Sequence, residues 1–163
     1  MNQARNESLK VAARGALFMS VLWFLVSMPL DSIIDMPGYY VLLRGWAGAF
    51  ELNEPCVAFG WYANPLLLTT WLALGSSATA DHRATILLAS VATILGICVV
   101  FGSRVVATLA GMTEVMTLGP GSWVWVGSLC LGLASAILAQ IAEPSQQQPD
   151  VISAPTDKPR KRM

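Results

Sequence analysis

Charged residues are scarce in this chain of 163 residues: Asp, Glu, Lys and Arg make up 12% of it, against 55% hydrophobic residues. Soluble domains carry about 25% charged residues, so this chain has too little polar surface to cover a water-soluble globule of its size. The high apolar content argues against a disordered regulator. The formal net charge of +0 argues against a nucleic-acid-binding protein. The composition predicts an integral membrane protein.

The sequence patterns of catalytic and metal sites are also missing. The three cysteines, Cys56, Cys98 and Cys130, form no C-x-x-C pair, and the chain has one histidine, His82. It has no Gly-rich phosphate loop, no G-x-S-x-G motif and no H-E-x-x-H motif. We therefore expect no catalytic residues, no cofactor and no metal ion. We interpret Cys98 and Cys130 as small apolar core residues, and His82 as a solvated loop residue.

Four charge-free windows are each long enough to hold a membrane-spanning helix, which needs about 20 largely apolar residues. We predict an all-α, integral membrane four-helix bundle within residues 1–142. The predicted spans are residues 11–30, 57–74, 85–101 and 123–141. Residues 143–163, with four prolines and a basic end, cannot bury enough apolar surface to fold and are predicted to form a disordered cytoplasmic tail.

The first apolar segment follows Arg5, Lys10 and Arg14, which also fits the start of a secretory signal peptide. The expected small-x-small cleavage site is poor, because residues 26–28 lead straight into Pro29. We favour a retained helix and keep cleavage as the alternative.

Lysine and arginine are distributed unevenly between the predicted loops. With both termini in the cytoplasm, eight of the ten lie in inner segments, and only Arg44 and Arg104 lie in outer loops. Cytoplasmic loops of membrane proteins carry such an excess. The sequence predicts a multi-pass membrane protein with N- and C-termini cytoplasmic.

The first outer loop contains a helical repeat. Tyr39, Leu43, Trp46 and Phe50 recur at steps of four, three and four residues, which is the spacing of one helix face. We predict a short amphipathic helix that lies on the outer membrane surface with its aromatic rings at headgroup depth. A docking surface for a partner is the alternative.

Carboxylates surround this helix. Asp31, Asp35, Glu51 and Glu54 lie in the first outer loop, and Glu114 lies in the second. Together they suggest a divalent cation, but they lack the dense Asp/Asn/Gly spacing of a calcium loop. We favour a solvated acidic loop.

Two features within the predicted spans are structural candidates. Asn64 and Pro65 interrupt the second span, where the proline bends a helix and the Asn64 amide either caps the break or bonds a neighbouring helix. Ser128, Gly132 and Ala136 form a small-xxx-small stripe that suits close helix packing, within the bundle or in a dimer.

Three short elements carry a resemblance to known proteins. They are Gly45-Trp46, then residues 61–68 with the pattern W-x-A-N-P-L-L-L, then residues 123–128 with the pattern W-x-W-x-x-S. In this order they resemble a group of uncharacterised small bacterial four-helix inner-membrane proteins. The resemblance implies a bacterial inner membrane and four spans, and it implies no activity or site.

We therefore predict a non-enzymatic accessory or interaction protein of the bacterial inner membrane. Its expected contacts are the lipid bilayer and either a membrane protein partner or a second copy in a homo-oligomer, with no nucleic acid. One alternative is a small transporter or channel component in which Asn64 lines a pathway. A second alternative is a metal-dependent membrane enzyme that uses the outer-loop carboxylates.

Overall fold

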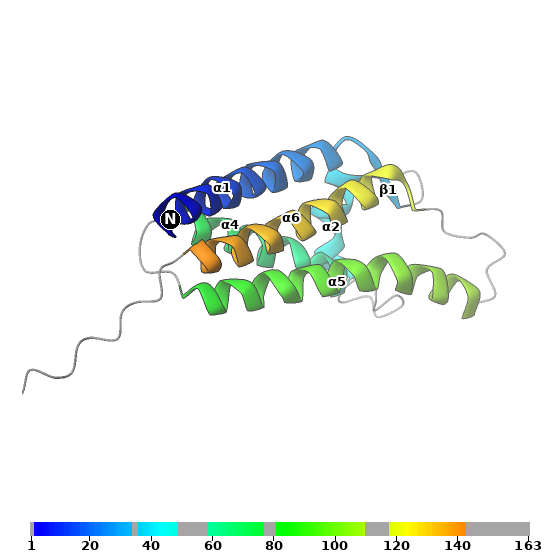
Figure 1. The fold of residues 1–163 in the computed structure, drawn as a ribbon. Coiled ribbons are helices and arrows are strands. Elements are labelled where there is room, and N and C mark those ends of the chain that lie inside the picture. The colour runs from blue at the N-terminus through cyan, green and yellow to red at the C-terminus, as the bar shows by residue number, and fades with distance from the viewer. Residues whose placement is uncertain (1, 34–35, 49–58, 77–80, 110–117, 143–163) are drawn as a thin grey trace, which may run out of the picture.

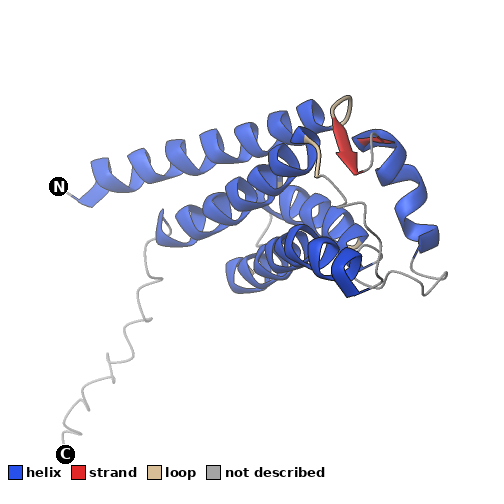
Figure 2. Ribbon diagram, turned by 90° about the vertical axis from the view of Figure 1, so that its right-hand side faces the viewer, coloured by secondary structure: helices blue, strands red, loops and turns tan. Residues whose placement is uncertain are grey.

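A computed structural model describes residues 2–33, 36–48, 59–76, 81–109 and 118–142. The described chain is mostly helical (Figure 1). Its helices are α1 (Asn2–Ser27), α2 (Gly38–Gly48), α4 (Ala63–Gly75), α5 (His82–Leu109) and α6 (Pro120–Ala142). A small antiparallel pair, β1 (Asp31–Ile33) and β2 (Met36–Pro37), lies beside α2 (Figure 2). The sequence analysis did not predict these strands.

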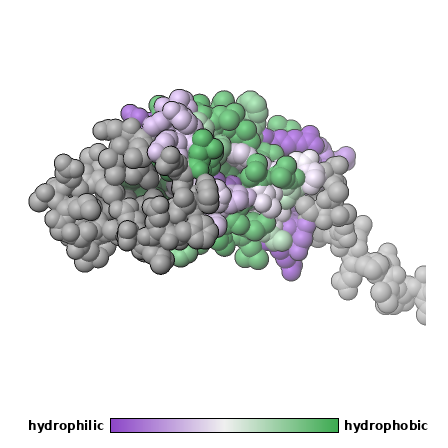
Figure 3. All heavy atoms as spheres, turned by 180° about the vertical axis from the view of Figure 1, so that it is seen from behind, coloured by the Kyte–Doolittle hydropathy of each residue, from purple (hydrophilic) through white to green (hydrophobic). Residues whose placement is uncertain are grey.

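Three of these helices are long and apolar enough to cross a membrane. They are Gln3–Ser27, His82–Phe101 and Pro120–Ala142, and their most apolar 18-residue stretches have mean hydropathies of 1.7, 2.5 and 1.9. They overlap the first, third and fourth predicted spans. Large apolar side chains point outward from them, among them Phe18 and Leu87, and hydrophobic residues dominate the middle of the surface (Figure 3). Helices of this kind indicate a membrane protein.

Within the second predicted span, residues 57–74, the structure describes one helix, α4, which begins at Ala63. Helix α4 has 13 residues, which at about 1.5 Å each gives roughly 20 Å of helix. Residues 59–61 form a separate helical turn, and residue 62 breaks the helical run. A proline ring clashes with the carbonyl four residues earlier, so Pro65 accounts for the break. The proline itself sits in the first turn of α4, where its missing N–H costs little.

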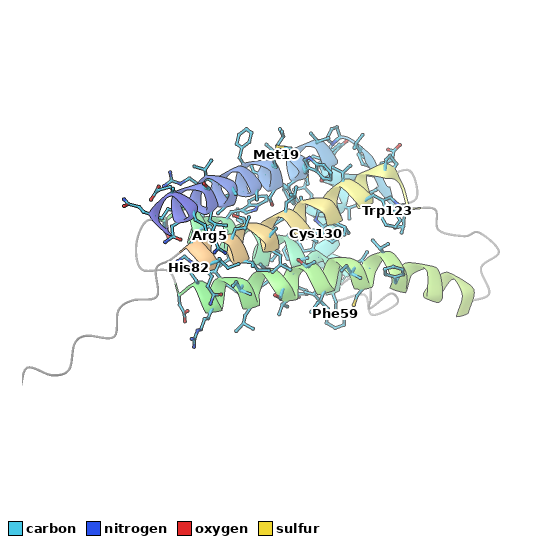
Figure 4. All side chains as sticks on the ribbon, viewed as in Figure 1. Arg5, Met19, Phe59, His82, Trp123 and Cys130 are labelled. Atoms are coloured by element: carbon cyan, nitrogen blue, oxygen red, sulfur yellow. The ribbon has the colours of Figure 1, made fainter. Side chains whose placement is uncertain are left out.

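The helices alternate in direction along the long axis of the molecule (Figure 1). The start of α1, the end of α4, the start of α5 and the end of α6 meet at one end, which we call the basic end. Helix α2 and the strands lie at the other, which we call the hairpin end. Figure 4 shows Arg5 and His82 near the basic end and Trp123 near the hairpin end.

Helix α6 packs against α1, α4 and α5. The centre of the core is a cluster of Ala63, Leu67, Ala92 and Leu129, with Phe24 and Trp71 packed against it. The rings of Phe24 and Trp71 meet edge to face with centroids 5.3 Å apart, a geometry that aromatic pairs prefer.

The small-residue stripe of α6 lies inside the molecule. Ser128, Gly132 and Ala136 are all buried. A Cβ built at Gly132 would lie 2.8 Å from Cδ1 of Leu67 and 3.3 Å from Oγ of Ser20. Glycine at this position therefore lets α6 approach both α4 and α1 closely. The stripe is covered by the chain's own helices, so it is not an open surface for a dimer.

Two cysteine predictions are wrong. Cys98 and Cys130 are exposed rather than buried in the core. Each lies two residues from a buried small residue, Gly96 or Ser128. Two residues correspond to about 200° around a helix, so the cysteines face away from the packed side.

Replacing Gly132 with leucine should destabilise the protein, because the new side chain enters the space of Leu67 and Ser20. Overpacking of this kind costs about 1–3 kcal/mol. The matched control is Gly15→Leu, since a Cβ at Gly15 meets nothing within 4 Å, and it should change stability by no more than about 0.5 kcal/mol. Thermal unfolding of the detergent-purified variants gives the comparison. Equal unfolding midpoints for the two variants would contradict this packing.

Candidate functional site

Asn64 accepts a hydrogen bond from a tryptophan on another helix. The indole Nε1 of Trp125, on α6, donates to Oδ1 of Asn64, in the first turn of α4, over 2.8 Å. Of the two roles predicted for the Asn64 amide, this geometry is the bond to a neighbouring helix. Both side chains are partly buried, where an unpaired indole N–H would be costly.

The hairpin end is held together by further hydrogen bonds. Trp61 Nε1 donates to the carbonyl oxygen of Leu42 over 2.6 Å, which ties the turn before α4 to α2. Ser122 Oγ donates to the carbonyl of Ser32 over 2.7 Å, which ties α6 to β1. The backbone N–H of Gly38 donates to the carbonyl of Leu30 over 2.9 Å, which fixes the start of α2.

These bonds surround a cavity of about 60 Å³, which we call the hairpin-end cavity. It is lined by residues of α1, β1, α2, the turn before α4, and α4, α5 and α6, including Ser27, Leu42, Trp61, Asn64, Val99 and Trp125. A buried water occupies about 10–15 Å³ by a comparable measure, so the space fits a few waters or one small solute.

Several of the donors that line this cavity already have partners within the chain. The hydroxyl of Ser27 donates to the carbonyl of Phe24 over 2.7 Å, and that of Ser122 is used as described above. The indoles of Trp61 and Trp125 are likewise paired within the chain. The cavity is therefore suited to a weakly polar molecule that leaves these hydrogen bonds in place.

Helix α2 divides its side chains between the cavity and the surface. Val41 and Leu42 line the hairpin-end cavity, whereas Tyr39 and Leu43 are exposed on the outside. Tyr39 and Leu43 share a face as predicted. Trp46 lies on α2, but its side chain is outside the described residues, as is the whole of Phe50.

A second group of hydrogen bonds, which the sequence analysis missed, joins three helices nearer the middle of the molecule. Trp71 Nε1, on α4, donates to Oγ of Ser20, on α1, over 3.0 Å. Ser20 Oγ in turn donates to the carbonyl of Ser128, on α6, over 2.7 Å. The only signal in the sequence was a serine within an apolar segment, which does not identify its partners.

Two further contacts between helices also use hydroxyl groups. Ser135 Oγ, on α6, donates to the carbonyl of Ala13, on α1, over 2.8 Å. Thr93 Oγ1, on α5, donates to the carbonyl of Ala89 in its own helix and lies 3.3 Å from the carbonyl of Leu129, on α6. These polar groups connect helices rather than forming an isolated reactive cluster.

The interpretation of His82 as a solvated loop residue is wrong. His82 is the first residue of α5, it is half-buried, and it lines a second cavity at the basic end together with Lys10 and Arg14. Helix α5 packs against α6, so its first residue reaches a cavity that α1 also lines.

Most of the outer-loop carboxylates belong to segments that the structure does not describe. Asp35, Glu51, Glu54 and Glu114 lie outside the described residues, and Asp31 begins β1. Within the described ranges, no three His, Cys, Asp or Glu side chains come together in a metal-binding group. The solvated acidic loop therefore stays a prediction, and a carboxylate metal site stays its alternative.

Comparison with protein-family models, curated proteins and solved structures finds no match to this chain.

Substitutions of Asn64 and Trp125 should be coupled. Asn64→Leu leaves the indole N–H of Trp125 without its acceptor, and we expect a loss of about 1–3 kcal/mol of stability. In the double variant with Trp125→Phe, the unpaired donor is removed as well, so the loss should be smaller than the sum of the single losses. The expected coupling energy is about 0.5–1.5 kcal/mol. Additive losses in a thermodynamic cycle would show that this hydrogen bond contributes nothing to stability.

Proposed function

We propose that the chain is a four-span protein of the bacterial inner membrane with both termini in the cytoplasm. In this proposal α1, α4, α5 and α6 form a membrane-embedded four-helix bundle. Helix α4 and the turn before it carry the chain back from the hairpin end to the basic end. The orientation is supported by Arg5, Lys10, Arg14 and Arg83, which lie in the first turns of α1 or at the start of α5, because basic residues are retained on the cytoplasmic side.

Cysteine labelling tests this topology. In a variant whose three natural cysteines are replaced by alanine, Asp31→Cys and Asp81→Cys each introduce one exposed thiol, one before α4 and one after it. A membrane-impermeant maleimide should label residue 31 from outside intact spheroplasts and residue 81 only after permeabilisation. Labelling of both residues from outside would mean that α4 does not cross the membrane. Labelling of residue 81 alone from outside would reverse the orientation.

We further propose that the protein is a non-enzymatic accessory protein that contacts a membrane protein partner through α2. The observation that carries this proposal is the construction of α2. Hydrogen bonds from Gly38, Tyr39 and Trp61 fix its backbone, yet Tyr39 and Leu43 remain exposed. A helix held this firmly, with aromatic and aliphatic groups on its outer face, is preorganised for contact, so little ordering entropy is lost on association.

Co-purification in mild detergent tests the partner contact. The protein should elute with a stoichiometric partner, and Tyr39→Ala with Leu43→Ala should reduce the bound partner at least tenfold. The control pair is Leu72→Ala with Leu87→Ala, because these side chains are exposed to a similar degree, both 66% against 53% for Tyr39 and 68% for Leu43. Elution of the protein alone, or equal loss of the partner in both pairs, would contradict a contact through α2.

The hairpin-end cavity favours a second candidate, a component that binds or passes a small solute. Its support is the convergence of Asn64 and Trp61 on one cavity, which is the arrangement expected if Asn64 lines a pathway. Flux of small neutral solutes into proteoliposomes should then fall in Asn64→Leu but not in Thr69→Leu. Thr69 is an exposed residue of α4 whose hydroxyl bonds only the carbonyl of Pro65 among the described residues.

A further inference from the structure

The basic end contains the larger of the two cavities described for this chain. Its volume is about 190 Å³, and it lies between α1, α4, α5 and α6. By the measure of about 10–15 Å³ per buried water, it has room for a group the size of a phosphate. We call it the basic-end cavity.

The polar lining of this cavity consists of two cations, a histidine and Ser135. Lys10 and Arg14 line it from α1, and His82 lines it from the start of α5. Lys10 and Arg14 are four residues apart and so project from the same face of the helix. Within the described residues, no carboxylate is among the lining groups.

Two carboxylates lie close in sequence to these lining groups, and one of them pairs with Lys10. Glu7 pairs with Lys10, its Oε1 lying 3.0 Å from Nζ, and both side chains are about half exposed or more. Exposed ion pairs of this kind contribute little, so an incoming anion can replace Glu7. Asp81, just before α5, accepts the backbone N–H of Arg83 over 3.0 Å and thereby caps that helix.

The rest of the lining is apolar. Leu17, Leu74, Ala13 and Ala139 form walls beside the cationic groups. A free inorganic anion gains nothing from such walls, whereas the glycerol and first acyl carbons of a lipid bury apolar surface against them. Basic pockets between membrane helices on the cytoplasmic side are suited to anionic lipid headgroups.

We propose that the basic-end cavity binds the phosphate of an anionic phospholipid, with Lys10 and Arg14 as the cationic ligands. The phosphate accepts hydrogen bonds from the Nζ of Lys10 and the guanidinium of Arg14, and the lipid backbone lies along Leu17 and Leu74. The choice of a lipid as the source of this phosphate rests on the proposed membrane insertion, in which the basic end faces the cytoplasmic leaflet. Binding itself is measured on the purified protein and does not depend on its orientation.

Native mass spectrometry of the full-length protein in detergent tests the proposal with three additives: dioleoyl phosphatidylglycerol, dioleoyl phosphatidylcholine and inorganic phosphate. We expect phosphatidylglycerol to bind at least tenfold more tightly than phosphatidylcholine, and millimolar inorganic phosphate to displace it only weakly. Equal binding of the two lipids would overturn the proposal. Binding of inorganic phosphate as tight as that of phosphatidylglycerol would make the ligand a soluble phosphate and overturn the lipid assignment.

Two double variants, each of which removes two positive charges, distinguish binding in the cavity from general attraction to the basic end. Lys10→Gln with Arg14→Gln should weaken phosphatidylglycerol binding at least tenfold. Arg5→Gln with Arg83→Gln removes two exposed arginines of the same end that do not line the cavity, and it should change binding less than twofold. Equal weakening in both would show surface attraction rather than a site.

A third variant tests the space itself. Ala139→Leu narrows the cavity without changing its charge, and it should also weaken phosphatidylglycerol binding severalfold. Binding is compared only among variants whose thermal unfolding midpoints equal that of the unmodified protein. A loss of binding in such a variant does not reflect a loss of fold. Unchanged binding in Ala139→Leu would place the lipid outside the cavity and overturn the proposal.

Discussion

The hydrogen bond from Ser20 to the carbonyl of Ser128 is the contact on which the helix arrangement most depends. Ser20 is fully buried, accepts a hydrogen bond from the indole N–H of Trp71 and donates its own O–H to the carbonyl of Ser128 on α6, so one hydroxyl joins three helices. Each bond in such a chain polarises the next. The close approach of α6 at Gly132 brings these groups within reach, because a Cβ there would lie 3.3 Å from Oγ of Ser20. Packing and polar bonding are therefore set by the same few small residues.

The sequence predicts the long helices well, because their apolar length is a property of the chain alone. The spans at residues 85–101 and 123–141 fall within α5 and α6, and the spacing of Tyr39 and Leu43 predicts α2. The inward face is harder to predict. In a helix that is apolar all round, hydropathy does not separate packed from outward residues, and Cys98 and Cys130 were misplaced for that reason.

The candidate site was predictable only in part. Asn64 stood out because an amide beside a proline is unusual in an apolar segment, and its bond to another helix was one of two predicted roles. Its partner was not, since Trp125 fits equally well in an aromatic belt at the membrane surface. The cationic cavity also escaped the sequence analysis, because Lys10 and His82 are 72 positions apart in the chain. Only the packing of both α1 and α5 against α6 brings them together.

The attachment of α2 has a mechanical consequence. Tyr39 N–H bonds the carbonyl of Met28 and Gly38 N–H bonds that of Leu30, both over 2.9 Å, so the start of α2 is coupled to the segment that leaves α1. The indole of Trp61 holds the middle of α2 to the turn before α4. A change in the tilt of α1 relative to α4 therefore strains both attachments and turns α2 as a lever. In the membrane-embedded bundle that we propose, thinning of the bilayer would reach the outer face of α2 by this route.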